Sequence, residues 1–420
     1  MRETTFVLMA NAMLRASGTL LFVLVGRISG PDDAGVFALA LGYLAILTTL
    51  FTGIDDLLIK EVTAAPENVL RLVAAYGMLR MPLVVLLYGV IIGFARTATQ
   101  MSSDQMMVLS LVVLSAVFEG VMGIGQAVLY SFGNFKSLLY SAVVVFVLRT
   151  GIGSLVLATR GLLAATTLWP ISSLAGAIVV LSSAIWTVKG SRISLTPLAL
   201  EGPILRRLAV LMPSFGTVSL LSALEYQCDV ILLAMLRASS AVAIYAAAVS
   251  VVNILALISQ AYRIVLFPRL VRLRDNTSTV VGRLVWRAAG HMAVLGIAIA
   301  LGVTLMAHWL IHQVFGARFQ ATEPVLEVLI WNVVFLFVNV PFVRYLMATG
   351  QQNRVSGALV LSMSANLGAN LLLIPYLGPT GAAWSRLASS TVFLISVSIL
   401  VVRRLRRPQP LESTHAEVVQ

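Results

Sequence analysis

Charged residues and cysteine are both scarce in this sequence of 420 residues. Asp, Glu, Lys and Arg together make up 11% of the chain, and Cys228 is its one cysteine. A lone cysteine can form neither an intramolecular disulfide nor a cysteine-based zinc site, which excludes a disulfide scaffold and dithiol redox chemistry. The polar stretches are also too short to house a soluble catalytic domain. We therefore expect no enzyme active site, no metal site and no cofactor.

Apolar sequence, by contrast, is abundant. Hydrophobic residues make up 59% of the chain, and the mean hydropathy is +0.96. A run of about 20 apolar residues spans the hydrocarbon core of a bilayer, and about twelve such runs follow one another here. They are predicted at 6–26, 34–54, 72–95, 106–130, 137–158, 162–188, 207–236, 240–262, 287–307, 324–347, 354–374 and 380–402. The sequence therefore predicts an all-α polytopic membrane protein.

The distribution of positive charge predicts the orientation of these spans. Most of the 29 Lys and Arg residues fall in alternate loops, on one side of the membrane. The loops on the other side hold Arg27, Arg96, Arg160, Arg237 and Arg318. Positive residues in short loops stay on the cytoplasmic side. This predicts cytoplasmic termini, and it makes the net charge of +12 a topology signal rather than a nucleic-acid-binding surface.

Three arginines lie deep within the spans of the first half. Arg15, Arg80 and Arg149 each lie roughly 12–18 Å in from the first residue of their predicted helix at ~1.5 Å per residue. An arginine at this depth costs about 2.5–3.5 kcal/mol even on the most lenient scale, and Glu119 is the only acidic residue predicted deep in the same half. One carboxylate offsets one of three cations. The excess predicts a hydrated cavity that binds an anionic group, most naturally a diphosphate, because the guanidinium binds phosphate with two parallel hydrogen bonds. The alternative is a purely structural role.

Further polar residues within the spans have two interpretations each. Glu225 and Asp229 lie one turn apart on one helix face, and these two and Glu119 either form salt bridges or hydrogen bonds, or couple transport to H+, Na+ or the membrane potential. Asn366 and Asn370 are likewise one turn apart. They either hold helices together or contact a sugar.

The two halves of the chain resemble each other. The stretch "GVFALA" (35–40) matches "AIYAAA" (243–248), and a longer alignment pairs Gly133 with Gly350 and Gly161 with Gly378. Repeats with an even number of spans insert in the same direction, which predicts two lobes of about six helices with a cleft between them. The predicted division is a lobe at 1–190, a cytoplasmic linker at 191–206, a lobe at 207–402 and a basic, disordered tail at 403–420.

Several motifs, in order, give the sequence a resemblance to one family. They are "GRISGPDDAGVFALA" (26–40), "EYQCDVILLAML" (225–236) followed by Tyr245, "VLFPRL" (265–270), and "SANLGANLLLIPYLGPTGAAW" (364–384) with its paired asparagines. This series resembles the polysaccharide biosynthesis or oligosaccharide flippases (Wzx-type) of the multidrug/oligosaccharidyl-lipid/polysaccharide exporter superfamily. The resemblance covers nearly the whole chain and implies a fold like that of the MATE transporters.

The resemblance implies a transporter of the bacterial inner membrane. Its cargo would be a polyprenyl-diphosphate-linked oligosaccharide, moved from the cytoplasmic to the outer leaflet by alternating access for O-antigen, capsule or exopolysaccharide synthesis. Arg15, Arg80 and Arg149 would hold the diphosphate. The protein is expected to be a monomer that works beside a polysaccharide polymerase and chain-length proteins. The alternatives are a lipid II-type flippase and a multidrug or cation exporter of the same fold.

Overall fold

The computed structural model describes residues 2–99, 101–191, 196, 202–272 and 278–406, and helices account for nearly all of them. The helices are α1 (Arg2–Ile28), α2 (Pro31–Ala64), α3 (Val69–Ala98), α4 (Ser103–Ser131), α5 (Phe135–Phe146), α6 (Gly153–Gly190), α7 (Gly202–Leu236), α8 (Ser239–Arg272), α9 (Ser278–Val314), α10 (Glu323–Leu329), α11 (Asn332–Ala348), α12 (Gln352–Leu377) and α13 (Pro379–Arg406), with short turns η1 (Pro66–Asn68), η2 (Val147–Ile152) and η3 (Ala317–Thr322). No strand occurs in these ranges, which confirms the predicted fold class.

Length and composition identify eleven segments of the described chain that can cross a membrane. One of them, Phe135–Gly190, has 56 residues. At ~1.5 Å per residue it would be more than twice as long as the hydrocarbon core is thick. Gly161 divides it with a φ of 81°, outside the helical range. The two parts, on either side of Gly161, correspond to the separate spans predicted at 137–158 and 162–188.

Local sequence explains where several helices begin. α2 starts at Pro31, whose fixed φ suits the first helical position, and Asp32 and Asp33 follow in the first turn, where the helix dipole favours negative charge. α4 starts with a reciprocal cap in which Ser102 accepts from the Gln105 amide at 3.3 Å and the Gln105 side chain accepts from the Ser102 amide at 3.0 Å.

Glycines at matching positions end helices in both halves of the chain. Gly133 and Gly350 both have a φ of 72°, and Gly161 and Gly378 have φ values of 81° and 57°. Residues with a side chain rarely adopt this left-handed conformation, so the turns depend on glycine. The pairs are those that the sequence alignment matched, and the backbone thus supports the predicted internal repeat.

The chain divides into two compact units. Unit 1 comprises Met1–Ala247 with two short later segments, Ile311–Thr322 and Asn370–Ala382. Unit 2 comprises Ala248–Leu310, Glu323–Ala369 and Ala383–Gln420. Most of the linker predicted at 191–206 lies outside the described residues, and so does the tail from 407 onward; residues 403–406 belong to α13. The predicted lobe boundary therefore stays a prediction.

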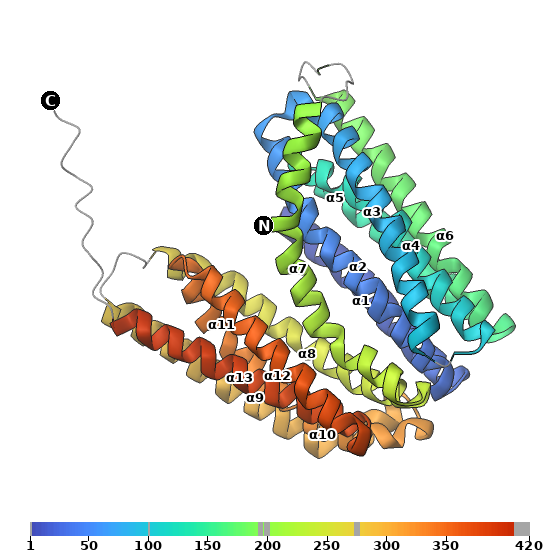
Figure 1. Cartoon of the computed structure of the whole chain (residues 1–420), viewed down its shortest axis with the longest axis vertical. Helices are drawn as coiled ribbons and strands as arrows, with labels where there is room; N and C mark the ends of the chain where they lie inside the picture. The colour runs from blue at the N-terminus through green and yellow to red at the C-terminus, as the bar shows by residue number, and fades with distance from the viewer. Residues whose placement is uncertain (1, 100, 192–195, 197–201, 273–277, 407–420) are drawn as a thin grey trace. The chain divides into compact units, whose positions relative to one another are not determined.

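The core of unit 1 is built around α2. This helix packs against α1, α3, α4 and α7, and α4 packs against α6 (Figure 1). Small residues allow the close approach of α4 to α6 and of α6 to α5. A Cβ at Gly125 would meet Val180 at 2.6 Å, and a Cβ at Gly176 would meet Val145 at 2.7 Å. These tightly packed helices position the polar groups described below.

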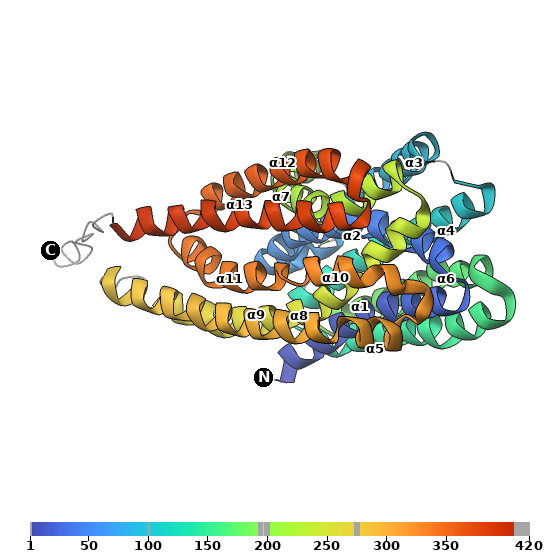
Figure 2. The same cartoon turned by 90° about the horizontal axis from the view of Figure 1, so that it is seen from below.

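Unit 2 has an apolar core of its own. α9, α11, α12 and α13 contribute to it, as the elongated bundle in Figure 2 shows. Phe342, Tyr345 and Leu346 of α11 lie at its centre, and Trp286 of α9 meets Phe342 edge to face with 5.0 Å between the ring centroids.

Candidate functional site

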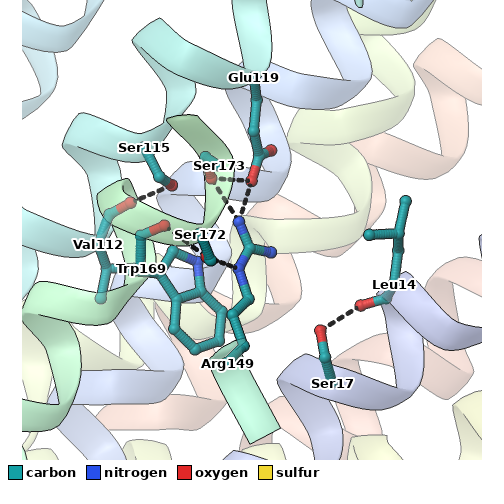
Figure 3. A network of polar contacts seen from close by, with 9 residues as sticks. All are labelled: Leu14, Ser17, Val112, Ser115, Glu119, Arg149, Trp169, Ser172 and Ser173. Atoms are coloured by element: carbon teal, nitrogen blue, oxygen red, sulfur yellow. Dashed lines mark hydrogen bonds and ion pairs between the residues drawn. The ribbon is translucent and has the colours of Figure 1, made fainter. Parts of the chain in front are cut away.

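Arg149 lies in a buried polar cluster inside unit 1 (Figure 3). Its Nη2 donates to Glu119 Oε1 at 2.6 Å and to Ser173 Oγ at 2.5 Å, and its Nε donates to Ser172 Oγ at 2.8 Å. The guanidinium also lies over the Trp169 ring, 4.6 Å from the centroid. The residue is 6% exposed. The cluster offsets the cost of burying this charge with a carboxylate, two hydroxyls and an aromatic face.

The backbone at Arg149 departs from the regular helix. Val147–Ile152 form a π-helical turn between α5 and the first part of α6. π-Helical turns are rare in proteins overall, and those that occur often lie at functional sites. The extra residue per turn changes the direction of the following side chains. It places Arg149 where the guanidinium meets Glu119 of α4 and the serines of α6.

Arg80 has a different environment. Its Nη1 donates to Asp55 Oδ1, and Tyr76 donates its hydroxyl to the same carboxylate oxygen at 2.8 Å. The guanidinium lies 5.0 Å from the centroid of the Phe51 ring. However, Arg80 Nε is buried without a hydrogen-bond partner. The charge of Arg80 is therefore paired, but its hydrogen-bonding capacity is only partly used.

The ion pair between Arg80 and Asp55 corrects the sequence analysis. The second apolar run is predicted from the sequence to end at residue 54, which leaves Glu119 as the only deep carboxylate predicted in the first half. The structure continues α2 to Ala64, so that Asp55 lies within the helix and faces α3. The signal was present, since no helix breaker separates Gly53 from Pro66 and Leu57, Leu58 and Ile59 continue the apolar pattern. Two of the three arginines are therefore compensated, rather than one.

A small cavity connects the two clusters. Its volume is about 90 Å³, and its lining includes Asp55, Arg80 and Glu119 together with Thr52 and Gln126. Arg149 does not line it. Both carboxylates thus border one polar space, but only one of the two arginines does.

Arg15 lies midway along α1 and is exposed. Ser17 of the same helix is completely buried, and two residues correspond to roughly 200° around a helix, so Arg15 points away from the buried face that carries Ser17. Asn11, one turn earlier, is exposed as well, and Thr19 lies one turn later. No described residue forms an ion pair with Arg15. A polar stripe with an uncompensated cation thus runs along the surface of unit 1.

Asp229 occupies a second polar cluster of unit 1. The residue is completely buried, and it accepts from the Tyr245 hydroxyl at 2.5 Å and from Asn370 Nδ2 at 2.8 Å. The cluster joins α7, α8 and α12. Glu225 lies one turn earlier on α7 and is half-buried. The two hydrogen bonds offset the cost of burying this polar side chain.

The paired asparagines form helix contacts. Asn370 bonds Asp229, as described, and Asn366 Nδ2 lies 3.5 Å from Ser389 Oγ within unit 2. Both asparagines are completely buried. This burial favours the helix-packing interpretation over a sugar contact in this conformation.

One end of unit 1 is held together by arginines that bond helix carboxyl ends. Arg27 at the end of α1 donates through Nε to Val314 O at 2.7 Å and through Nη2 to Gln313 O. Arg237 at the end of α7 donates through Nε to Ile374 O at 3.2 Å and through Nη2 to Pro375 O. The carbonyls at a helix end have no partner within the helix and attract positive charge. These contacts attach Ile311–Thr322 and Asn370–Ala382 to unit 1.

Aromatic packing strengthens the first of these two junctions. The rings of Phe22 and Phe315 meet edge to face at 5.9 Å, and Phe315 and Phe319 are 5.4 Å apart. All three are buried. Gly26 of α1 leaves room for Phe319, whose ring a Cβ would meet at 2.8 Å. Among the described residues, no group of three or more His, Cys, Asp or Glu side chains is placed to hold a metal ion.

The sequence matches a known family, and the structure is similar to solved structures. A family model described as "Polysaccharide biosynthesis protein" matches residues 23–324. The structure is similar to that of the lipid II flippase MurJ in an inward closed conformation, with 14% identity, coverage of 95% of this chain and 87% of that chain, and a TM-score of 0.77. It is equally similar to an inward-facing multidrug resistance MATE family transporter of the MOP superfamily, with 12% identity, coverage of 95% and 98%, and a TM-score of 0.77.

A third similar structure is the MATE transporter VcmN of Vibrio cholerae in its bent form, with 16% identity, coverage of 96% of each chain and a TM-score of 0.58. These solved structures are transporters and flippases, not enzymes. At such low identity they show the fold alone. Among curated proteins, none matches the sequence.

Proposed function

Because the chain belongs to the polysaccharide biosynthesis protein family, we propose that it transfers a polyprenyl-diphosphate-linked oligosaccharide from the cytoplasmic to the outer leaflet of a bacterial inner membrane. Both termini are cytoplasmic in this proposal. The observation that carries it is the exposed Arg15 midway along a membrane-spanning helix. Lipid tails cannot offset that charge, whereas a hydrated cleft with an anionic ligand can.

Arg15 is the first contact of the diphosphate in this mechanism. It is accessible, it is permanently charged, and no described carboxylate competes for it. The exposed Asn11 one turn away adds an amide that can donate to the same group. The polyprenyl chain stays in the lipid while the protein carries the sugar and the diphosphate.

Arg80 is the second contact. It borders the polar cavity, and its buried Nε still lacks an acceptor. A diphosphate carries more negative charge than one carboxylate and offers several acceptor oxygens, so it competes with Asp55 for the guanidinium. When the cargo leaves, Asp55 takes its place, and the buried cation is never uncompensated.

Arg149 supports the site rather than contacting the cargo. It donates hydrogen bonds to Glu119, Ser172 and Ser173, and it does not line the cavity. It fixes Glu119 at the edge of the polar space. We thus assign Arg15 and Arg80 to binding of the diphosphate, and Arg149 to holding Glu119 in place.

The arginine junctions form the outer closure in this proposal. The orientation predicted from the positive charges places Arg27 and Arg237 at the outer end. Alternating access then requires that the bonds to Val314 and Ile374 break when the site opens outward. Asp229, buried beside the second junction, is the proposed coupling carboxylate, since the hydrogen bond from Asn370 connects it to the segment that this junction holds.

The experiment is leaflet-resolved transfer in vesicles that contain the purified protein. The arms are a polyprenyl-diphosphate oligosaccharide, lipid II and a cationic dye, each with wild type, Arg15→Ala and the exposed control Arg96→Ala. We expect transfer of the oligosaccharide lipid alone, and a loss of roughly tenfold or more in Arg15→Ala because a charge-assisted contact contributes about 1.5–3 kcal/mol. Transfer of lipid II or of the dye in place of the oligosaccharide would instead support one of the alternative functions.

A further inference from the structure

A second, larger pocket lies at the other end of unit 1. It has a volume of about 870 Å³ and lies where the last turns of α2 meet the first turns of α7. Its polar lining consists of Lys60 and Glu61 from α2 and Arg206 and Arg207 from α7. It shares no lining residue with the cavity beside Arg80. The proposed transfer mechanism makes no use of it.

The charges of this pocket do not balance. Arg207 Nη2 bonds Glu61 Oε1 at 3.0 Å, and the Glu61 side chain is 11% exposed, so that this carboxylate is committed to one partner. Lys60 and Arg206 are exposed, and no ion pair to either is formed within the described part of the chain. Three cations and one anion leave an excess of positive charge. The electrostatics therefore favour an anionic ligand.

The remaining lining is apolar. Val210 is 70% exposed, and Leu211 and Pro203 lie beside it. A free inorganic anion gains nothing from such a wall, whereas an amphiphile can place its charged group between Lys60 and Arg206 and its chain along Val210. Basic pockets between membrane helices on the cytoplasmic side bind anionic lipid headgroups in this way.

We propose that this pocket binds the phosphate group of an anionic lipid in the cytoplasmic leaflet. The positive charges identify this end as cytoplasmic, which places the pocket at headgroup level. The phosphate bridges α2 and α7 and holds the first turns of α7 against α2. Because α7 contains Pro213 just beyond the pocket, these first turns can adopt their own angle. The lipid thereby sets the angle of the first turns of α7, which the cargo does not contact.

The test is lipid binding by the purified full-length protein in detergent, followed by native mass spectrometry. The probes are phosphatidylglycerol, phosphatidylcholine and inorganic diphosphate, and the variant is Lys60→Ala/Arg206→Ala. The matched control is Arg283→Ala/Arg287→Ala, which removes two exposed arginines from α9. We expect the pocket variant to bind phosphatidylglycerol roughly thirtyfold more weakly than wild type, since each basic residue near the surface contributes about 1 kcal/mol. The control variant should bind like wild type.

The arms separate the possible sources of the phosphate. If phosphatidylglycerol binds and inorganic diphosphate does not displace it, the pocket recognises a phospholipid; if diphosphate displaces it, the pocket recognises the phosphate itself, including that of a lipid-linked cargo. A second variant, Glu61→Gln, should bind phosphatidylglycerol more tightly because it releases Arg207. Equal binding by wild type and the pocket variant, or an equal loss in the control, overturns the proposal. None of these readouts depends on transfer, so they hold whether or not the proposed transport is found.

Discussion

Arg80 and Arg149 are equally deep in the sequence pattern, yet they have different surroundings. Arg149 has a carboxylate, two serines and an aromatic face, and it does not line the cavity. Arg80 has one carboxylate, a buried Nε without an acceptor and an open polar space beside it. A buried arginine can thus keep one set of partners or exchange its carboxylate for another anion. The number of hydrogen bonds that its guanidinium donates separates the two cases.

The largest loss of stability is expected for a substitution that breaks the ion pair between Arg149 and Glu119. Glu119→Gln leaves Arg149 buried without its counterion, and removing one partner of a buried pair costs about 3–5 kcal/mol. We expect a marked loss of stability in denaturant unfolding in detergent, followed by tryptophan fluorescence. The double variant Glu119→Gln/Arg149→Met, which removes both charges, should recover much of that loss. A double variant as unstable as the single one would contradict a closed structural pair.

A smaller loss of stability is expected when the ion pair between Arg80 and Asp55 is broken. In Asp55→Asn, Arg80 keeps the Phe51 face and gains access to solvent or an anion through the cavity. We expect a cost of about 1.5–3 kcal/mol, the range for a hydrogen bond to a charged group. The same unfolding measurement, with and without added diphosphate, checks this. Diphosphate should restore stability in Asp55→Asn and not in Glu119→Gln.

Gly123→Ala sharpens the comparison without removing a charge. A Cβ at this position would lie 2.8 Å from both Arg80 Nη2 and Asp55 Oδ2, so the pair must move apart. Forcing extra volume into a packed site costs about 1–3 kcal/mol. Gly89→Ala is the matched control, because a Cβ there meets nothing within 4 Å; it should leave stability equal or slightly higher. Unfolding curves of both variants that coincide with that of wild type would show that the pair is looser than described.

The smallest effect is expected for Ser173→Ala. The hydroxyl accepts from Arg149 and donates to Glu119 at 3.2 Å, but the ion pair itself remains without it. We expect a loss of about 1 kcal/mol, measured in the same unfolding series. A loss as large as that of Glu119→Gln would mean that the serine, rather than the charge, holds the cluster.

Much of this architecture could be predicted from sequence. The apolar runs located the membrane spans, and the repeat alignment paired glycines that share a left-handed backbone, including Gly161, where a 56-residue helical segment divides. Span boundaries were the weak point. The continuous apolar run ends before Asp55. The helix continues beyond it because its backbone hydrogen bonds and the buried face that carries Leu57 still stabilise it. An acidic partner for Arg80 was missed for this reason alone.

The environment of each arginine could not be predicted. Arg149 and Arg15 look alike in the sequence, but the π-helical turn at Val147–Ile152 and the facing of α1 make one buried and the other exposed. Ser172 and Ser173 gave no signal, because serines in membrane helices are common and bond their own backbone. Such pairings depend on how helices face each other, which a single sequence does not specify.

The most direct test of the central claim is the affinity of the purified protein for a short-chain polyprenyl diphosphate, measured by titration for wild type, Arg15→Ala and Asp55→Asn. We predict opposite shifts in affinity for the two variants. Arg15→Ala should bind roughly tenfold or more weakly because a cationic contact is lost, and Asp55→Asn should bind more tightly because the competing carboxylate is gone. Unchanged affinity in Arg15→Ala, together with equal or weaker binding in Asp55→Asn, would contradict the assignment of these two arginines to the diphosphate.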